Sequence, residues 1–202
     1  IHNWAEQIGV RPRTVISVGK EGTFVNNYVV LKPVRSVQSF PTARLEGEGA
    51  VVKFNSVAIA HPGSTLDLGS RAVLSAPNTG AEIISRTITT GGTMYARGHL
   101  VGEAPRIKAH LECKGLILKE GGVQIAIPEL EARVPDVEMT HEAAVGKIAQ
   151  DQVEYLMARG LDEEQAVGMI VRGFLEGGIK GLPQNLKDEI DRAVSQTDIG
   201  GM

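Results

Sequence analysis

The sequence GAVVKFNSVAIAHPGSTLDLGSRAVLSAPN, residues 49–78, shows the pattern that decides the fold of this chain. Two runs rich in aliphatic and β-branched residues are separated by the turn sequence HPG at residues 61–63. In the second run, leucines at 66 and 68 alternate with small or polar residues at 65, 67 and 69. A period of two residues predicts strands with one apolar and one polar side.

Similar runs extend outward from this stretch, from Thr14 to about Val134, each bounded by glycine or proline. They are TVISVG, FVNNYVVLKP, AEIISRTITTGG, IKAHLECKGLIL and VQIAIPELEARV. No helix of ten or more residues intervenes, which excludes a parallel sheet built from alternating strands and helices and leaves sandwiches, barrels and β-solenoids. We find no repeat of fixed period, so a sandwich stays open. A chain with 24 glycines and only 4% aromatic residues favours the solenoid, whose stacked inner layers hold small aliphatic side chains.

The pattern becomes helical near Glu142, and we expect three helices. The first carries an apolar stripe, the second runs from about Glu163 to Leu175 after a capping box formed by Asp162 and Gln165, and the third follows Pro183. The stripe of the first is Val145, Ile148, Ala149, Val153, Leu156 and Met157, and that of the third is Leu186, Ile190, Ala193 and Val194. We therefore divide the chain into a β-body, residues 1–135, and a helical domain, residues 136–202. The helices should cap the β-body, and their stripes either pack only within the chain or offer a docking surface.

Composition excludes several classes of partner. A formal net charge of -3 with mixed signs gives no electrostatic case for nucleic acid. No run of 18 apolar residues is present, so we expect no membrane partner. A single cysteine, Cys113, cannot form an internal disulfide, and we expect an intracellular, cytoplasmic protein.

Several ordered motifs resemble one known family. They are IHNW at residues 1–4, SFPT at 39–42, SAPNTGAEIISRTITTGG at 75–92, Tyr95, Arg97 and Gly98, Cys113, residues 141–147 and residues 152–172. Their wording and order are similar to the SufB/SufD family, the scaffold proteins of iron-sulfur cluster assembly. The matches run along nearly the whole chain.

The resemblance implies a fold, a task and partners. It implies a right-handed parallel β-helix followed by a small helical domain that binds the ABC-type ATPase SufC. It also implies that a transient iron-sulfur cluster is built on the scaffold and passed to recipient apoproteins. The chain has no G-x-x-x-x-G-K-[ST] loop for nucleotide phosphates, so we expect a non-enzymatic component whose partner hydrolyses ATP.

The first candidate ligand is Cys113. Its thiolate is a soft ligand suited to iron-sulfur chemistry, and the SufB branch of the family has its cluster-associated cysteine in a similar strand. Without the resemblance, a lone cysteine in a strand is more often a small buried apolar residue.

His141 and Glu142 match the His-Glu-Ala sequence to which the SufB branch assigns cluster binding. On a helix they would point about 100° apart, so both reach one metal only if the chain is not yet helical there. Otherwise Glu142 stabilises a helix start and His141 lies on a surface. His99 and His110 are weaker candidates, and His61 is expected in a turn.

Three side chains do not complete a site that typically takes four ligands. The simplest source of the rest is a second copy or a SufD-like paralogue, joined through the β-helix. Other partner chains, sulfide and small thiols are further sources. Two alternatives stay open: a SufD-like adaptor that binds the ATPase but no cluster, and a β-helix enzyme acting on polysaccharides, for which the scattered Trp4, Tyr28 and Tyr95 give little support.

Overall fold

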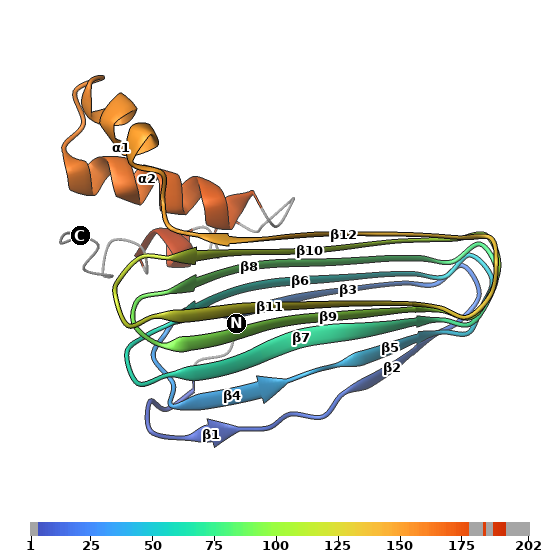
Figure 1. The fold of residues 1–202 in the computed structure, drawn as a ribbon. Helices are drawn as coiled ribbons and strands as arrows, with labels where there is room; N and C mark the ends of the chain where they lie inside the picture. Colours follow the sequence, from blue (N-terminus) through green and yellow to red (C-terminus); the bar gives the residue numbers. More distant parts are fainter. Residues whose placement is uncertain (1–3, 178–183, 185–187, 193–202) are drawn as a thin grey trace.

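The chain folds into a parallel β-solenoid with helices on one side (Figure 1). The computed structural model describes residues 4–177, 184 and 188–192. One sheet, called sheet B here, contains β3 (Thr23–Val30), β6 (Val51–Ala60), β8 (Gly80–Thr89), β10 (Ile107–Ile117) and β12 (Val137–Gly146). The other, sheet A, contains β1 (Gly9–Val10), β2 (Val15–Val18), β4 (Ser36–Ser39), β5 (Thr42–Leu45), β7 (Thr65–Leu74), β9 (Thr93–Gly102) and β11 (Val123–Ala132). The predicted β-helix is confirmed.

Each coil contributes to both sheets, so residues one coil apart become neighbours in space. Val51 pairs with Gly80, an offset of 29 residues, and Ile107 pairs with Val137, an offset of 30. Gly80 pairs with Lys108, an offset of 28. The coil length therefore varies, which explains why no fixed period is visible in the sequence.

One corner of every coil carries a residue in the left-handed region. These residues precede the strands of sheet B and are Glu21, Gly49, Asn78, Arg106 and Asp136, with φ between 55° and 73°. Most are not glycine, and each non-glycine residue there costs about 1–2 kcal/mol. Their side chains compensate in part: Asn78 donates to Glu48, and Arg106 donates to Asn78. The repeated turn fixes the start of each strand and so the register of sheet B.

Aliphatic side chains from the two sheets fill the interior. Leu66, Leu74, Leu100 and Leu111 are fully buried, as the alternation predicted for β7 requires. The two sheets approach each other closely at Gly98, where a Cβ would overlap the Leu111 side chain. The absence of large rings keeps this interior thin.

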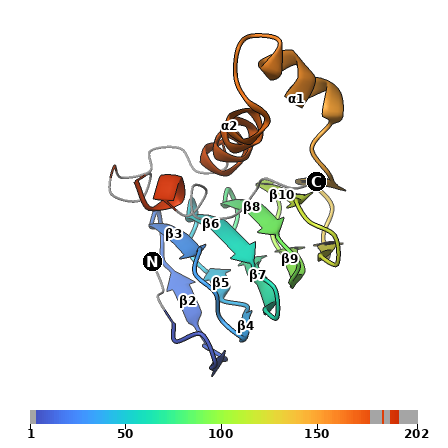
Figure 2. The ribbon, with the colours of Figure 1, turned by 90° about the vertical axis from the view of Figure 1, so that its left-hand side faces the viewer.

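Two helices, α1 (Gln150–Met157) and α2 (Glu163–Glu176), follow the solenoid. α2 lies over the outer face of sheet B, and α1 packs against α2 (Figure 2). Their buried side chains pack with outward-facing residues of the sheet. This cluster contains Val29, Val57, Ile59 and Ile88 from sheet B, Val153 from α1, and Val167, Val171 and Leu175 from α2. The predicted capping box at Asp162 and Gln165 is confirmed.

The C-terminal tail departs from the expected arrangement in two respects. The first helix starts at Gln150, and the expected start near Glu142 is wrong because β12 continues to Gly146 by pairing with β10. The expected cap over the end of the solenoid is also wrong, since α2 packs on the face of sheet B. Of the third helix, Ile190 is helical and buried, whereas Pro183, Leu186, Ala193 and Val194 lie outside the described residues.

No helix in the described part of the chain has both the length and the apolar character needed to cross a bilayer.

Candidate functional site

Cys113 lies inside the solenoid. Along β10 the buried residues alternate, and Leu111 and Cys113 share the inward side. The thiol residue is 1% exposed and packs in the same aliphatic cluster as Ile83 and Leu100. Burial, with a smaller contribution from the neighbouring charge of Glu112, raises the pKa of Cys113 to about 11. At neutral pH the group is therefore a protonated, inaccessible thiol.

Cys113 is nevertheless only one strand from the end of the solenoid. In the register of sheet B it pairs with Ser85 on β8 and with Ala143 on β12. Ser85 in turn accepts a hydrogen bond of 3.0 Å from Ser56 on β6, the next strand of sheet B away from β12. β12 is the last strand of sheet B, so separating β12 from β10 would uncover the thiol and leave the inner coils paired.

His141 and Glu142 are strand residues, and this changes how they relate to Cys113. His141 pairs with Leu111, and Glu142 pairs with Glu112. Because successive side chains in a strand point to opposite faces, His141 shares the inward side with Cys113 and Glu142 lies on the outer face. His141 is two residues from Ala143, the register partner of Cys113, so the Cα atoms are roughly 8 Å apart. The structure thus places Cys113 and His141 on one side and separates Glu142 from them.

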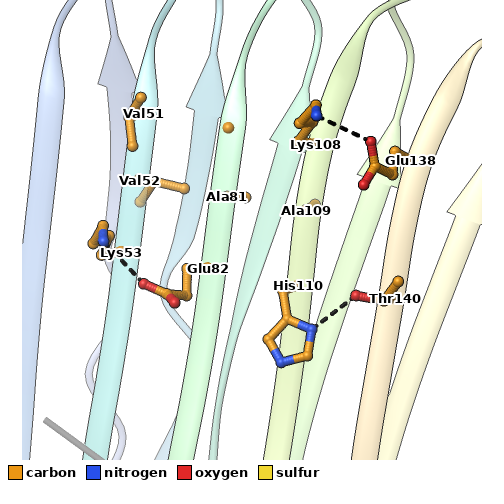
Figure 3. A pocket seen from close by; sticks show the side chains of 11 residues that line it. Val51, Val52, Lys53, Ala81, Glu82, Lys108, Ala109, His110, Glu138 and Thr140 are labelled. Atoms are coloured by element: carbon orange, nitrogen blue, oxygen red, sulfur yellow. Dashed lines mark hydrogen bonds and ion pairs between the residues drawn. The ribbon is translucent and has the colours of Figure 1, made fainter.

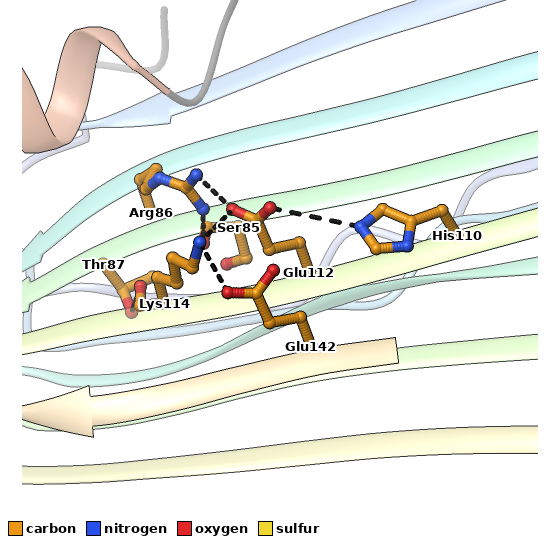
Figure 4. A network of polar contacts seen from close by, with 7 residues as sticks. All are labelled: Ser85, Arg86, Thr87, His110, Glu112, Lys114 and Glu142. Carbon is orange, nitrogen blue, oxygen red and sulfur yellow. Dashed lines mark hydrogen bonds and ion pairs between the residues drawn. The ribbon is translucent and has the colours of Figure 1, made fainter. Parts of the chain in front are cut away.

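Glu142 belongs to a polar network on the outer face of sheet B (Figure 4). Lys114 Nζ lies 2.8 Å from Glu142 Oε1 and 3.4 Å from Glu112 Oε1. Arg86 forms an ion pair with the same Glu112 oxygen. The hydrogen bond from Lys114 holds the pKa of Glu142 below its usual range, and Glu142 in turn raises the pKa of Lys114.

Sequence reasoning missed Arg86, Glu112 and Lys114. A signal for part of this network is the offset of 30 residues between Glu112 and Glu142, one coil, which makes the two carboxylates register partners. Arg86 also contacts α2, because its guanidinium carbon lies 5.8 Å from the centre of the Phe174 ring.

His110 lies at the edge of this network and of a shallow groove on the outer face of sheet B. It interacts with Thr140 Oγ1 through Nδ1 at 2.8 Å, and its Nε2 is 4.0 Å from Glu112. Along the groove, drawn in Figure 3, each lysine faces a glutamate: Lys53 with Glu82 at 3.0 Å and Lys108 with Glu138 at 3.2 Å. These charges compensate one another, so the groove shows no preference for a charged ligand.

The other histidines have structural partners. His99 Nε2 is 3.5 Å from Glu131. His61 is a turn residue, as predicted: its carbonyl accepts a hydrogen bond from Ser64, and its ring contacts the Leu31 carbonyl at 2.7 Å. Within residues 4–177, 184 and 188–192, no three His, Cys, Asp or Glu side chains are grouped so that they could hold a metal ion. The described residues of one chain therefore present no preformed group of three such ligands.

Comparison with known proteins gives a consistent result. Residues 1–174 match the SufBD core domain of the SUF system for iron-sulfur cluster assembly. An iron-sulfur cluster assembly SufBD family protein of Archaeoglobus fulgidus is 54% identical over 198 residues, which are 98% of this chain and 53% of that protein. A protein of the same description from Methanothermobacter thermautotrophicus is 48% identical over 98% of this chain and 48% of its own length. A relative from Staphylococcus saprophyticus is 34% identical over 96% of this chain and 42% of its own length. The chain thus spans about half the length of these relatives.

Proposed function

Because this chain belongs to the SufBD family of iron-sulfur cluster assembly proteins, we propose that it is a cytoplasmic scaffold on which a nascent cluster is built at the end of the solenoid. The cluster is cargo, which the scaffold passes to recipient apoproteins. The observation that carries the proposal is the position of Cys113, which shares the inward side of the last two strands of sheet B with His141. Thiolate and imidazole are both good iron ligands.

The buried, protonated form of the Cys113 thiol is the resting state of the scaffold. Iron binds the thiolate, whereas the apolar surroundings favour the protonated thiol and keep solvent away. Assembly therefore requires that β12 moves from β10 far enough to hydrate Cys113. Most of β12 is exposed, and it lacks a following strand in the described chain, so this opening disturbs few contacts compared with opening an inner coil.

A second copy of the scaffold supplies the remaining ligands. The last coil leaves Val123, Ile125, Leu130 and Val145 between 36% and 44% exposed, and both of its strands are sheet edges. Exposed edges that carry apolar side chains favour pairing with another chain. Two copies related by a twofold axis would bring Cys113 and His141 of each chain to one interface. A SufD-like paralogue could take the place of the second copy.

The helices provide the surface for an ABC-type ATPase. Tyr155 and Met157 on α1 and Met169 on α2 are 58%, 42% and 48% exposed, although both helices also contribute buried side chains to the cluster on the outer face of sheet B. Apolar groups presented on a helix pair fit a groove in a partner. ATP hydrolysis then takes place in the partner, and its conformational change moves the helices relative to the solenoid.

One observation favours a second candidate, a SufD-like adaptor that binds the ATPase and carries no cluster. Cys113 is fully buried, and the described residues of one chain form no metal group. The two candidates differ in cluster content, which can be measured directly.

The test is anaerobic loading of the chain with iron and sulfide, followed by measurement of iron per chain. Cys113→Ala should abolish most of the bound iron. Ser85→Ala, its register neighbour on β8, is the matched control because it removes a buried polar atom without removing the thiol, and it should retain the wild-type iron content. Equal iron in both variants would rule out Cys113 as a ligand. If the unmodified chain binds the ATPase and no iron, the adaptor is correct.

A further inference from the structure

A continuous line of contacts joins α2 to Glu142 across the outer face of sheet B. It begins at Phe174, whose ring lies 5.8 Å from the guanidinium carbon of Arg86. Arg86 pairs with Glu112, Glu112 pairs with Lys114, and Lys114 pairs with Glu142 (Figure 4). Each pair except the first contact is an ion pair.

Burial decreases steadily along this line. The side chain of Arg86 is 10% exposed, that of Glu112 14%, that of Lys114 30% and that of Glu142 54%. Arg86 and Glu112 are thus largely removed from water, and an ion pair in such surroundings is less screened than one in solvent. A buried charge left without its partner is costly, so Arg86 and Glu112 depend strongly on each other.

Two charges in the line are shared, and this makes the pairs compete. Glu112 forms ion pairs with both Arg86 and Lys114, and Lys114 forms ion pairs with both Glu112 and Glu142. While Arg86 neutralises Glu112, Lys114 is available to Glu142. If Arg86 withdraws, the unneutralised Glu112 attracts Lys114 and the carboxylate of Glu142 is released.

The position of α2 decides which arrangement holds. The Phe174 ring lies against the guanidinium of Arg86, and this cation–π contact helps to keep Arg86 in the partly buried pair. Lifting α2 would hydrate Arg86 and weaken its hold on Glu112.

We infer that Arg86 and Lys114 are positioning residues that couple α2 to Glu142, so that seating α2 on sheet B keeps the Glu142 carboxylate masked and lifting α2 releases it. This inference rests on the proposed function for its purpose, since it frees a carboxylate on the outer face of sheet B when a partner moves the helices. Coupling of this kind is reciprocal. A cation that draws Glu142 away from Lys114 should therefore loosen α2.

The test measures how readily the Glu142 carboxylate of the full chain reacts with a carbodiimide and an amine, read by mass spectrometry of the peptide that contains it. Lys114→Gln removes the direct partner. The ion pair is exposed to solvent and therefore weak, so labelling of Glu142 should rise by up to about fivefold. Phe174→Leu keeps an apolar residue against sheet B, removes the ring, and should produce a rise in the same direction.

Tyr155→Leu is the matched control. Tyr155 forms the same type of contact with Arg159, at 5.2 Å on α1, and touches none of the four charges in the line. This variant should label Glu142 as the wild type does. The double variant Phe174→Leu/Lys114→Gln should label no more than Lys114→Gln alone, because both changes act through Lys114.

Two results would overturn the inference: labelling of Glu142 unchanged by Phe174→Leu while Lys114→Gln raises it, or no rise with Lys114→Gln. Arg86→Lys retains a positive charge beside Glu112. If that charge is what matters, labelling of Glu142 should rise less in Arg86→Lys than in Phe174→Leu. The comparison also guards against simple unfolding as the cause of the rise. The assay contains neither iron nor ATPase, so its outcome is independent of whether Cys113 binds a cluster.

Discussion

Ionisation of Cys113 should destabilise the folded chain at high pH. Burial, with a smaller contribution from the charge of Glu112, raises the pKa of the folded thiol from 9.0 to about 11. The unfolded chain, in which the thiol is hydrated, ionises near 9.0. Since the folded pKa is the higher one, the stabilisation is fully present below pH 9.0 and is lost as the pH rises toward about 11.

These two pKa values set the size of the effect. They correspond to almost no loss at about pH 8 and to a loss of roughly 2 kcal/mol at about pH 10.5. Other groups also titrate in this range, and Cys113→Ala provides the correction because it lacks only the thiol. Between these two pH values, the free energy of unfolding in urea should fall by roughly 2 kcal/mol more for the wild type than for the variant, with reductant present.

Equal pH dependence in the two chains would contradict a buried, protonated Cys113. It would mean that the folded thiol ionises as easily as the unfolded one, and therefore that Cys113 is hydrated in solution. The resting state proposed for the scaffold would then be wrong, because the thiol would need no opening of β12 to bind iron.

Two further predictions concern the fold and the helices. Gly98→Ala should destabilise the solenoid by about 1–3 kcal/mol, because the added methyl overlaps Leu111. Gly80→Ala, whose Cβ would have only contacts of 3.8 Å, should change stability by less. Unfolding in urea measures both variants, and equal losses of stability would contradict the packing argument. Met169→Glu should abolish co-purification with the cognate ATPase. Val15→Glu, at an exposed site on the first coil, should leave co-purification intact. If the Met169→Glu variant still binds the ATPase, α2 is not part of the docking surface.

The β-body could be predicted from the sequence because its alternation is strong and local. Leucines at 66 and 68 are buried inside the solenoid, as their spacing predicts. The period could not be found, since register offsets vary from 28 to 30 residues within sheet B. What repeats is a corner with a left-handed residue, and residues as different as Glu21, Asn78 and Arg106 occupy it.

The last strand shows where local preference fails. Residues 138–144 contain alanine and glutamate, which favour helices, and their spacing also suits one. Pairing along the whole of β10 outweighs this preference and holds the segment as β12. The error had a consequence for the site, because it placed His141 and Glu142 around a helix start, whereas the strand directs them to opposite faces.

The network around Glu142 could not be predicted because its members are distant in sequence. Arg86 and Glu112 meet only through the register of β8 and β10, and Phe174 reaches Arg86 only because α2 packs on sheet B. A sequence indicates which side chains can form ion pairs. The coil offset decides which of them meet.

The most direct test of the scaffold proposal is native mass spectrometry of the chain after anaerobic loading with iron and sulfide. We predict a species of two chains that carries one cluster, and loss of that cluster in Cys113→Ala. A cluster bound to single chains, or two-chain species that keep the cluster without the thiol, would contradict a shared site at the end of the solenoid.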